Sequence, residues 1–358
     1  MWQRGDALRN ERSGPFLGHS VCWQRRTKIG NMAKRILITG ATGFVGRRLV
    51  SRLVEEGWHL TLTVRTSGTA VAWRREFDNL RIIETGPLEQ SQNLDLALAD
   101  VSSVVHLAGL AHRGDASETD FMRANAEATS QLADAAAANG VSAFIHLSSL
   151  AAVTENAASE TVNDNTNHEP TTPYGSSKRL AEQHVLTLPA RGIFAISLRP
   201  PLIVGAEAKG NWAALQRLAA TGFPLPFGGV NNRRSMIGID TLVEAIVHLC
   251  SKTWPIEKSG NYCIADPESL SLAEVVAELR KGMGLSPRLF SVPDVILRTA
   301  ANRVLKRRAA GLLGSLEVDA HRFAKQFDFP LKPRLREDIR RSGQEYRQLR
   351  QAEKATPT

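Results

Sequence analysis

Three glycines spaced three residues apart constrain the fold of this chain more than any other feature. They lie in the sequence GATGFVG (40–46), between a short apolar run, 35–39, and an amphipathic stretch, 44–56, that ends before Gly57. A strand, a glycine turn and a helix in this order bring backbone N–H groups close to a phosphate, because glycine has no side chain to obstruct the approach. The turn therefore predicts a dinucleotide-binding site.

Strand-like and helix-like segments alternate along the first 200 residues. Further strands are expected at 58–64, 80–84, 103–107, 142–147 and 193–198, and helices at 119–139 and 173–188. This alternation predicts an α/β fold with a doubly wound parallel sheet of the Rossmann type. Right-handed crossovers then place the carboxyl ends of the strands, and any ligand, at one edge of the sheet.

The regular alternation ends after residue 200, where prolines interrupt it. A smaller, mostly helical C-terminal substrate lobe is expected there, built from discontinuous pieces. We expect a disordered or wrongly assigned extension at 1–31, with Met32 as the natural start, and a Rossmann domain at 32–200. The substrate lobe would span 201–345, part of it returning to the Rossmann domain, and 346–358 would be a flexible tail.

Composition argues against several other classes of protein. No apolar run approaches the roughly 20 residues of a membrane-spanning helix. The three cysteines, Cys22, Cys250 and Cys263, have neither metal-site nor disulfide spacing, which favours a reducing, cytoplasmic location and no metal. The net charge of +9 is concentrated at the two ends of the chain, and no basic stripe is interleaved with aromatic residues. A nucleic-acid partner is therefore not expected.

The residue after the second predicted strand indicates the type of dinucleotide. An acidic side chain at this position accepts hydrogen bonds from the ribose hydroxyls of NAD. This chain has Arg65 instead, followed by Thr66 and Ser67. A guanidinium can pair with a 2′-phosphate, and the hydroxyls can donate hydrogen bonds to it. NADP is therefore favoured, although NAD stays open.

A tyrosine and a lysine four residues apart suggest acid–base chemistry. Tyr174 and Lys178 would lie on one face of the helix predicted at 173–188. A lysine ammonium beside a tyrosine, together with a cationic nicotinamide ring, is expected to lower the tyrosine pKa. The strand predicted at 142–147 is followed by Ser148 and Ser149, so a serine hydroxyl can bind the substrate oxygen that the tyrosine protonates.

The order of these motifs resembles that of the extended short-chain dehydrogenases/reductases, which include nucleotide-sugar epimerases, dehydratases and 4-keto reductases. The resemblance covers about residues 34–345. It rests on TGATGFVG (39–46), HLAG (106–109), Asn125, HLSS (146–149), YGSSK (174–178), LRPPLIVG (198–205) and RRSMIGID (233–240).

The resemblance implies roles for individual residues. Ser149, Tyr174 and Lys178 would be catalytic, and Lys178 would also hold the nicotinamide ribose. The cofactor would contact Gly40, Thr42, Gly43, Phe44, Val45, Gly46, Arg65, Leu107, Ala108, Gly109, Asn125, Tyr174 and Lys178. His106 also falls on a position that lines the cofactor or the active edge of the sheet.

The stretches 209–212 and 225–235 resemble those of reductases that act on UDP-4-keto-6-deoxy-N-acetylhexosamines, of the UDP-N-acetylquinovosamine 4-reductase kind. A guanidinium of Arg233 or Arg234 can clamp a diphosphate, and Arg234 matches the arginine of the family. Substrate contacts are expected from His112, Ser149, Asn211, Phe227, which would cover the uracil, and Arg234.

Three functions follow as hypotheses. The first is an NADP-dependent reductase of the 4-keto group of a UDP-linked deoxy-amino sugar for surface polysaccharide, such as lipopolysaccharide. The second is an NAD-dependent nucleotide-sugar 4-epimerase, and the third is a non-catalytic NADPH-binding regulator. The resemblance implies a homodimer through the helices near 119–139 and 173–190. The amphipathic, basic stretch 289–308 also suggests weak contact with an anionic membrane surface.

Overall fold

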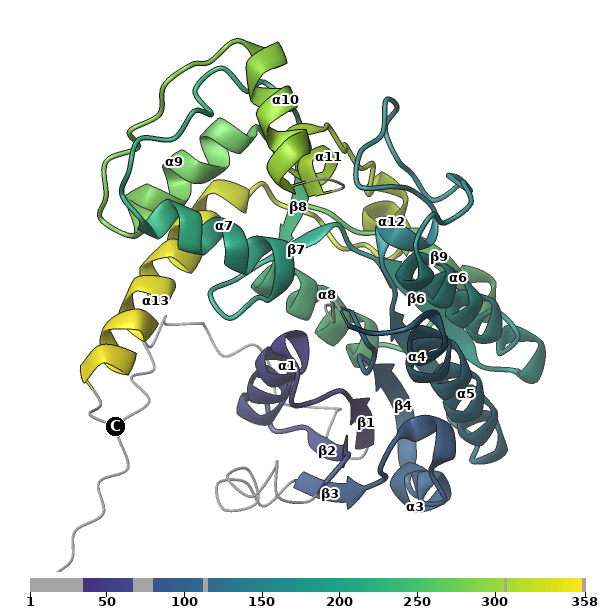
Figure 1. Cartoon of the computed structure of the whole chain (residues 1–358). Coiled ribbons are helices and arrows are strands. Elements are labelled where there is room, and N and C mark those ends of the chain that lie inside the picture. Colours follow the sequence, from purple (N-terminus) through teal and green to yellow (C-terminus); the bar gives the residue numbers. More distant parts are fainter. Residues whose placement is uncertain (1–34, 67–79, 112–114, 306–307, 356–358) are drawn as a thin grey trace, which may run out of the picture.

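The computed structural model describes residues 35–66, 80–111, 115–305 and 308–355 (Figure 1). Its main sheet has seven strands in the order β3-β2-β1-β4-β5-β6-β9, and neighbouring strands are parallel. The strands are β1 (Arg35–Thr39), β2 (His59–Val64), β3 (Leu80–Glu84), β4 (Val101–His106), β5 (Ala143–Leu147), β6 (Phe194–Arg199) and β9 (Gly260–Cys263). The strand order reverses between β1 and β4, where a doubly wound fold binds its ligand.

Helices cover both faces of this sheet. One face carries α1 (Phe44–Glu55) and α8 (Ile239–Ser251); the other carries α3 (Leu94–Leu98), α5 (Ala128–Ala138) and α6 (Pro173–Val185). Alternate residues of β1 therefore enter different cores: Ile36 and Ile38 pack beneath α1, whereas Leu37 packs beneath α5. Burial on both faces explains the nearly continuous apolar strands of the sequence.

The helix predicted at 119–139 is one continuous helical run with an irregular centre. It begins as α4 (Glu118–Phe121), passes through a π-helical segment, Met122–Glu127, and continues as α5. Ser117 and Asp120 form a capping box at its start, which ends the preceding loop. The wider π-helical turn carries Asn125, so the irregularity lies beside a predicted site residue.

The C-terminal lobe packs above the carboxyl ends of the strands (Figure 1). A three-stranded sheet of β7 (Leu202–Val204), β8 (Arg234–Gly238) and β10 (Ser269–Leu270) joins α7 (Gly210–Ala220), α9 (Leu272–Gly282), α10 (Asp294–Leu305), α11 (Arg308–Leu313) and α13 (Leu335–Ala355). The chain leaves the lobe for α8 and β9, and α12 (His321–Gln326) packs beside β9. The region is therefore helical, as expected, with its small sheet as an addition.

No helix in the described ranges is long and apolar enough to cross a membrane. Cys250 and Cys263 are buried free thiols, and burial raises the pKa of Cys250 to about 12. The proposed extension at 1–31, together with Met32 and Cys22, lies outside the described residues.

Candidate active site

The glycine turn has the geometry that the sequence predicted. Gly40 follows β1 with φ +68°, and a Cβ atom there would lie 2.6 Å from the backbone N of Ala108. At Gly46, a Cβ atom would lie 2.2 Å from the carbonyl oxygen of Gly40. Glycine is therefore required at both positions, because any side chain would push β1, α1 and the loop after β4 apart.

The turn fits the pyrophosphate of a dinucleotide. Gly43 caps α1 without using a side chain, so the first backbone N–H groups of the helix face an open approach. Thr42 is exposed, whereas Val45 is buried in the core and offers only its backbone to a ligand. The ring of Phe44 lies against Gly205, where an added Cβ would be 2.6 Å from it. Phe44 of the cofactor turn thus contacts Gly205, which follows β7 at the start of the lobe.

Arg65 lies just beyond β2 and is exposed. No hydrogen bond or ion pair joins it to another residue within the described ranges. An arginine in this position has its donors available for an anionic group. It lies at the carboxyl edge of the sheet, as its place directly after the second strand predicted.

Ser149 and Tyr174 are brought together from two different elements. Tyr174 begins α6, which Thr172 caps through the backbone N–H of Gly175, and Ser149 follows β5. Burial raises the pKa of Tyr174 above its usual 10, and the neighbouring Ser149 side chain lowers it only in part. The expected lowering is therefore wrong for the protein alone, and Tyr174 keeps its proton at neutral pH.

Lys178 lies one helical turn beyond Tyr174 and is almost fully buried. Its ammonium donates a hydrogen bond to the carbonyl oxygen of Leu147 at 2.8 Å, at the carboxyl end of β5. Burial lowers its pKa to about 8, while the charge of Glu182 opposes the change. Lys178 is thus a protonated side chain fixed between α6 and the carboxyl end of β5.

Asn125 holds the loop that follows β4. Its side-chain oxygen accepts from the N–H of Leu110 at 2.7 Å, and its amide donates to the Leu110 carbonyl and to Ser177. A Cβ at Gly109 would be 2.9 Å from this oxygen and 3.3 Å from the Lys178 ammonium. Because both amide hydrogens are used, Asn125 acts by positioning the half-buried loop of Leu107 and Ala108.

Two buried histidines lie behind this loop. His106 is held by Thr39 and Thr129 at 2.7 and 2.9 Å, and its ring stacks on that of His146 at 5.6 Å. Burial first, and the charge of Lys178 second, lower the pKa of His106 to about 3. Both effects also lower the pKa of His146. The histidines are therefore neutral packing groups, and His106 supports the loop from within the core.

A buried ion pair beside Lys178 was not predicted from the sequence. Glu182 accepts from Ser148 at 2.6 Å and from two nitrogens of Arg199 at 2.9 and 2.7 Å. The side chains of Arg199 and Glu182 are only 7% and 2% exposed. The only sequence signal was the spacing of Glu182, one turn beyond Lys178. The pair joins α6 to β6 and, through Ser148, to the end of β5.

The predicted substrate residues fall in different surroundings. Arg234 donates to the carbonyl oxygens of Asn156 and Gly314 at 3.0 and 2.8 Å, and burial lowers its pKa to about 10. Arg233 is exposed and pairs with Glu274 at 3.6 Å. The half-buried charge of Arg234 thus faces two carbonyl groups, which suits an anionic ligand better than the paired Arg233 does.

Asn211 is exposed at the start of α7. Phe227 is buried in the core of the lobe, so packing accounts for its position, and its contact with a base stays a prediction. His112 lies outside the described residues.

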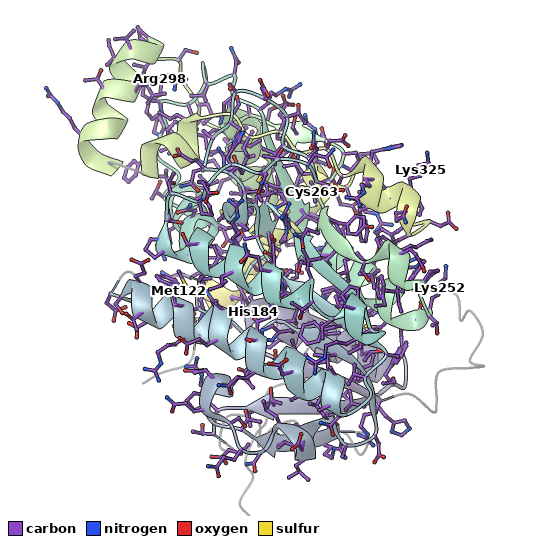
Figure 2. The ribbon with its side chains drawn as sticks, turned by 90° about the vertical axis from the view of Figure 1, so that its right-hand side faces the viewer. Met122, His184, Lys252, Cys263, Arg298 and Lys325 are labelled. Carbon is purple, nitrogen blue, oxygen red and sulfur yellow. The ribbon has the colours of Figure 1, made fainter. Side chains whose placement is uncertain are left out.

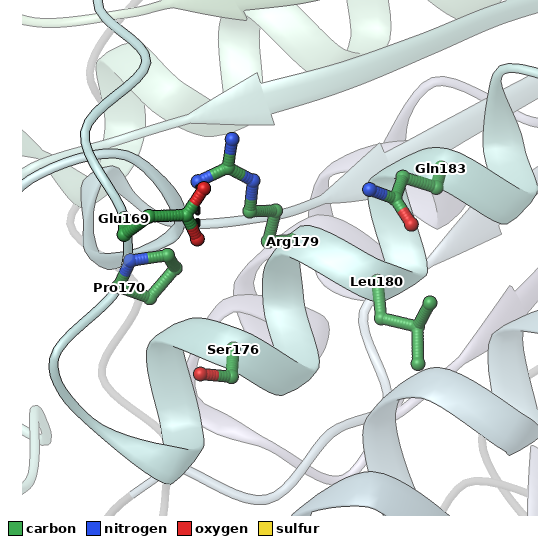
Figure 3. Close-up of a pocket in the computed structure, with 6 residues that line it drawn as sticks. All are labelled: Glu169, Pro170, Ser176, Arg179, Leu180 and Gln183. Atoms are coloured by element: carbon green, nitrogen blue, oxygen red, sulfur yellow. Dashed lines mark ion pairs between the residues drawn. The ribbon is translucent and has the colours of Figure 1, made fainter.

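A pocket on the outer face of α6 is a separate feature. Figure 3 shows its lining residues, with Arg179 and Glu169 forming an ion pair at 3.3 Å. Ser176, Arg179 and Gln183 lie on the side of the helix opposite Tyr174 and Lys178. The pocket therefore does not open onto the catalytic groups.

The parallel sheet, the glycine turn and the Ser–Tyr–Lys set define an enzyme of the extended short-chain dehydrogenase/reductase type. The family model described as NAD dependent epimerase/dehydratase family matches residues 36–265. The chain belongs to this family.

Two relatives and one solved structure show how the similarity is distributed. UDP-glucose 4-epimerase of Vibrio cholerae is 29% identical over 338 residues, covering 88% of this chain and 97% of the relative. Ceramide reductase of Caulobacter vibrioides is 30% identical over 267 residues, covering 74% and 75%. UDP-glucuronic acid 4-epimerase of Bacillus cereus in complex with NAD has a TM-score of 0.69 at 18% identity, covering 88% and 99%. The last comparison concerns the fold alone.

Proposed function

We propose that this enzyme uses NADPH to reduce the 4-keto group of a nucleotide-linked sugar, with a UDP-linked deoxy-amino sugar as the substrate class. The observation that carries the proposal is Arg65, which stands where an acidic residue would bind the ribose hydroxyls of NAD. An exchangeable NADPH suits net reduction, because each turnover consumes one reduced cofactor.

The residues of the site provide the remaining chemistry. The reduced nicotinamide supplies a hydride to the sugar carbon when it is bound. Tyr174 donates its proton to the oxygen of that carbon, which becomes a hydroxyl group. Ser149, next to Tyr174, donates a hydrogen bond to the same oxygen, and the Lys178 ammonium stabilises the phenolate that remains. The raised pKa of Tyr174 keeps it in the proton-donating form.

The glycine turn would hold the pyrophosphate of the cofactor, and Lys178 its nicotinamide ribose. Arg234 is the side chain that we assign to the diphosphate of the substrate, because its charge faces carbonyl groups rather than a carboxylate. Asn211 is assigned to the same ligand. The same proposal includes a cytoplasmic enzyme whose product is used to make surface polysaccharide. It also includes a homodimer formed through α5 and α6.

A second candidate is a nucleotide-sugar 4-epimerase. The match to the Vibrio cholerae epimerase, which spans 97% of that protein, favours it. An epimerase would use Tyr174 in both directions, first as a base and then as an acid, and would retain its nicotinamide. A non-catalytic regulator is disfavoured because Ser149, Tyr174 and Lys178 are all present and assembled.

The test is the consumption of NADPH by the purified chain with a UDP-4-keto-6-deoxy-N-acetylhexosamine made in place by a 4,6-dehydratase. Tyr174→Phe should lower turnover by about 10²- to 10⁴-fold while retaining NADPH binding. Tyr346→Phe, which alters a half-buried tyrosine of α13, is the matched control. Arg65→Asp should weaken NADPH binding by about 10- to 100-fold.

Failure to oxidise NADPH would reject the reductase. Conversion of UDP-glucose to UDP-galactose, with NAD released from the denatured protein, would then establish the epimerase. NADPH binding without either activity would indicate the regulator.

A further inference from the structure

Four large apolar side chains of the lobe are exposed, one after α7 and the others just before and at the start of α10. Phe223 is 73% exposed, Phe290 49%, Val295 77% and Ile296 59%. The other exposed large apolar side chains, such as Leu96, are scattered over separate elements. Monomeric proteins seldom gather exposed apolar groups without a partner for them. We call these four side chains and the arginines beside them the lobe tip.

Backbone contacts hold the parts of the lobe tip together. The N–H of Leu225 donates to the carbonyl of Arg288 at 3.0 Å, and the N–H of Phe290 donates to the carbonyl of Leu225 at 3.1 Å. The segment after Phe223 therefore runs beside the segment that leads into α10. The side chain of Arg280 also donates to the carbonyl oxygens of Phe223 and Pro287.

The orientation of α10 is fixed by one residue. Leu297 is buried in the core of the lobe, so Val295 and Ile296, which precede it, face away from that core. Figure 1 places α10 at the outer end of the lobe, away from the seven-stranded sheet. Neither exposed side chain is needed to pack the lobe.

Exposed arginines lie on the same segments as three of these apolar groups. Arg298 and Arg303 are exposed on α10, and Arg288 is exposed just before it. Residues 288–303 contain three arginines and one acidic residue, Asp294. Figure 2 shows Arg298 projecting from the end of the lobe, on the opposite side from Lys252 and Lys325. The face therefore combines apolar groups with a net positive charge.

We propose that the lobe tip docks on an anionic lipid bilayer, with Phe223, Phe290, Val295 and Ile296 in the interface. Apolar side chains enter the boundary between headgroups and acyl chains, while neighbouring arginines bind the anionic headgroups. A second copy of the chain is a poorer occupant, because a two-fold contact would place Arg298 and Arg303 against cations of the same face. The inference does not depend on the substrate or the cofactor.

The test is flotation of the full chain with vesicles of phosphatidylcholine and phosphatidylglycerol in equal parts. The wild type is expected to float with these vesicles at low ionic strength, and less in high salt or with phosphatidylcholine alone. Val295→Ser with Ile296→Ser should weaken binding in both salt conditions. Arg298→Ser with Arg303→Ser should weaken binding at low salt by about tenfold or more, and reduce its salt dependence.

Matched variants separate the lobe tip from general effects. Leu96→Ser removes an exposed leucine of α3, and Lys252→Ser with Lys325→Ser removes two exposed cations from the opposite side. Both controls should bind vesicles as the wild type does, and circular dichroism should show that every variant is folded. Absence of vesicle binding by the wild type, or equal loss in the controls, overturns the proposal. So does lipid-independent self-association that Val295→Ser with Ile296→Ser abolishes, because the face would then join two copies.

Discussion

Ser148 donates a hydrogen bond to Glu182 across 2.6 Å, which joins the serine next to Ser149 to the helix that carries Tyr174 and Lys178. Arg199 binds the same carboxylate through two nitrogens. One buried carboxylate of α6 therefore holds the segment after β5 and the end of β6 against the helix.

Glu182→Gln is expected to lower the free energy of unfolding by about 3 kcal/mol or more, because it leaves the buried charge of Arg199 without its counter-charge. Urea denaturation measures this loss. Glu353→Gln, at an exposed pair with Arg350 on α13, should cost about 0.5 kcal/mol or less. Replacing both buried partners, Glu182→Leu with Arg199→Met, should recover part of the stability. If Glu182→Gln is as stable as the wild type, the ion pair does not have this stabilising role.

The reduction should lose activity above about pH 8. The pKa of Lys178 is lowered from 10.5 to about 8, so its ammonium is present at neutral pH and is lost as the pH rises through this value. Tyr174 has a raised pKa and stays protonated over the same range. The profile of kcat/KM against pH measures the decline.

Two variants identify Lys178 as the source of that decline. Lys178→Arg keeps its charge at higher pH and should move the decline upward, even if its rate is lower. Glu182→Gln should move it downward, because the charge of Glu182 raises the pKa of Lys178. If neither variant shifts the pH at which activity declines, the decline belongs to another group.

Gly46→Ala should disrupt the cofactor turn. The new Cβ would lie 2.2 Å from the Gly40 carbonyl oxygen and 2.7 Å from the Cα of Ala41, and neither backbone atom can move alone. We expect a loss of about 1–3 kcal/mol in stability and weaker NADPH binding. Thermal unfolding and NADPH fluorescence measure the two effects.

Gly311→Ala is the control for this substitution, since its nearest neighbour would be the Asn156 Cβ at an ordinary 3.5 Å. Equal behaviour of the two variants would show that the close approach at Gly46 has no consequence.

Phe227 is expected to act through packing. Because its ring lies in the core of the lobe, Phe227→Ala should cost about 3–5 kcal/mol of stability. Phe227→Leu retains most of the apolar contact and should bind UDP as the wild type does in calorimetry. Weaker UDP binding by the leucine variant at near-normal stability would instead support the contact with uracil.

The sequence predicted the parts of the fold that depend on local pattern. The strand at Leu80–Glu84 has the bounds expected of it, and α1 ends one residue before the position expected from Gly57. Apolar runs and glycine stops act within one element, so their physical cause is visible in neighbouring residues. Tyr174 and Lys178 were visible for the same reason, because they share a helix, whereas Ser149 was assigned from the family resemblance.

The long-range contacts were not predictable in this way. Glu182 and Arg199 are 17 residues apart, and only the packing of α6 against β6 brings them together. The raised pKa of Tyr174 likewise depends on burial by the assembled protein, whereas the sequence showed only the lysine next to it. Phe227 was assigned to a ligand because the sequence did not show its burial in the lobe core. Several distant segments form that core.

The composition of that core has a consequence for how the protein is made. Leu335 and Ile339 of α13 are fully buried beside residues of α7 and α9, and Trp212 donates a hydrogen bond to Ser342, 130 residues later. On the ribosome, α7 emerges long before the helix that covers it. The nucleotide-binding turn can form early, but the lobe can close only after α13 has left the exit tunnel. A premature stop before residue 335 would therefore release a chain with an exposed apolar core, a substrate for chaperones and proteases.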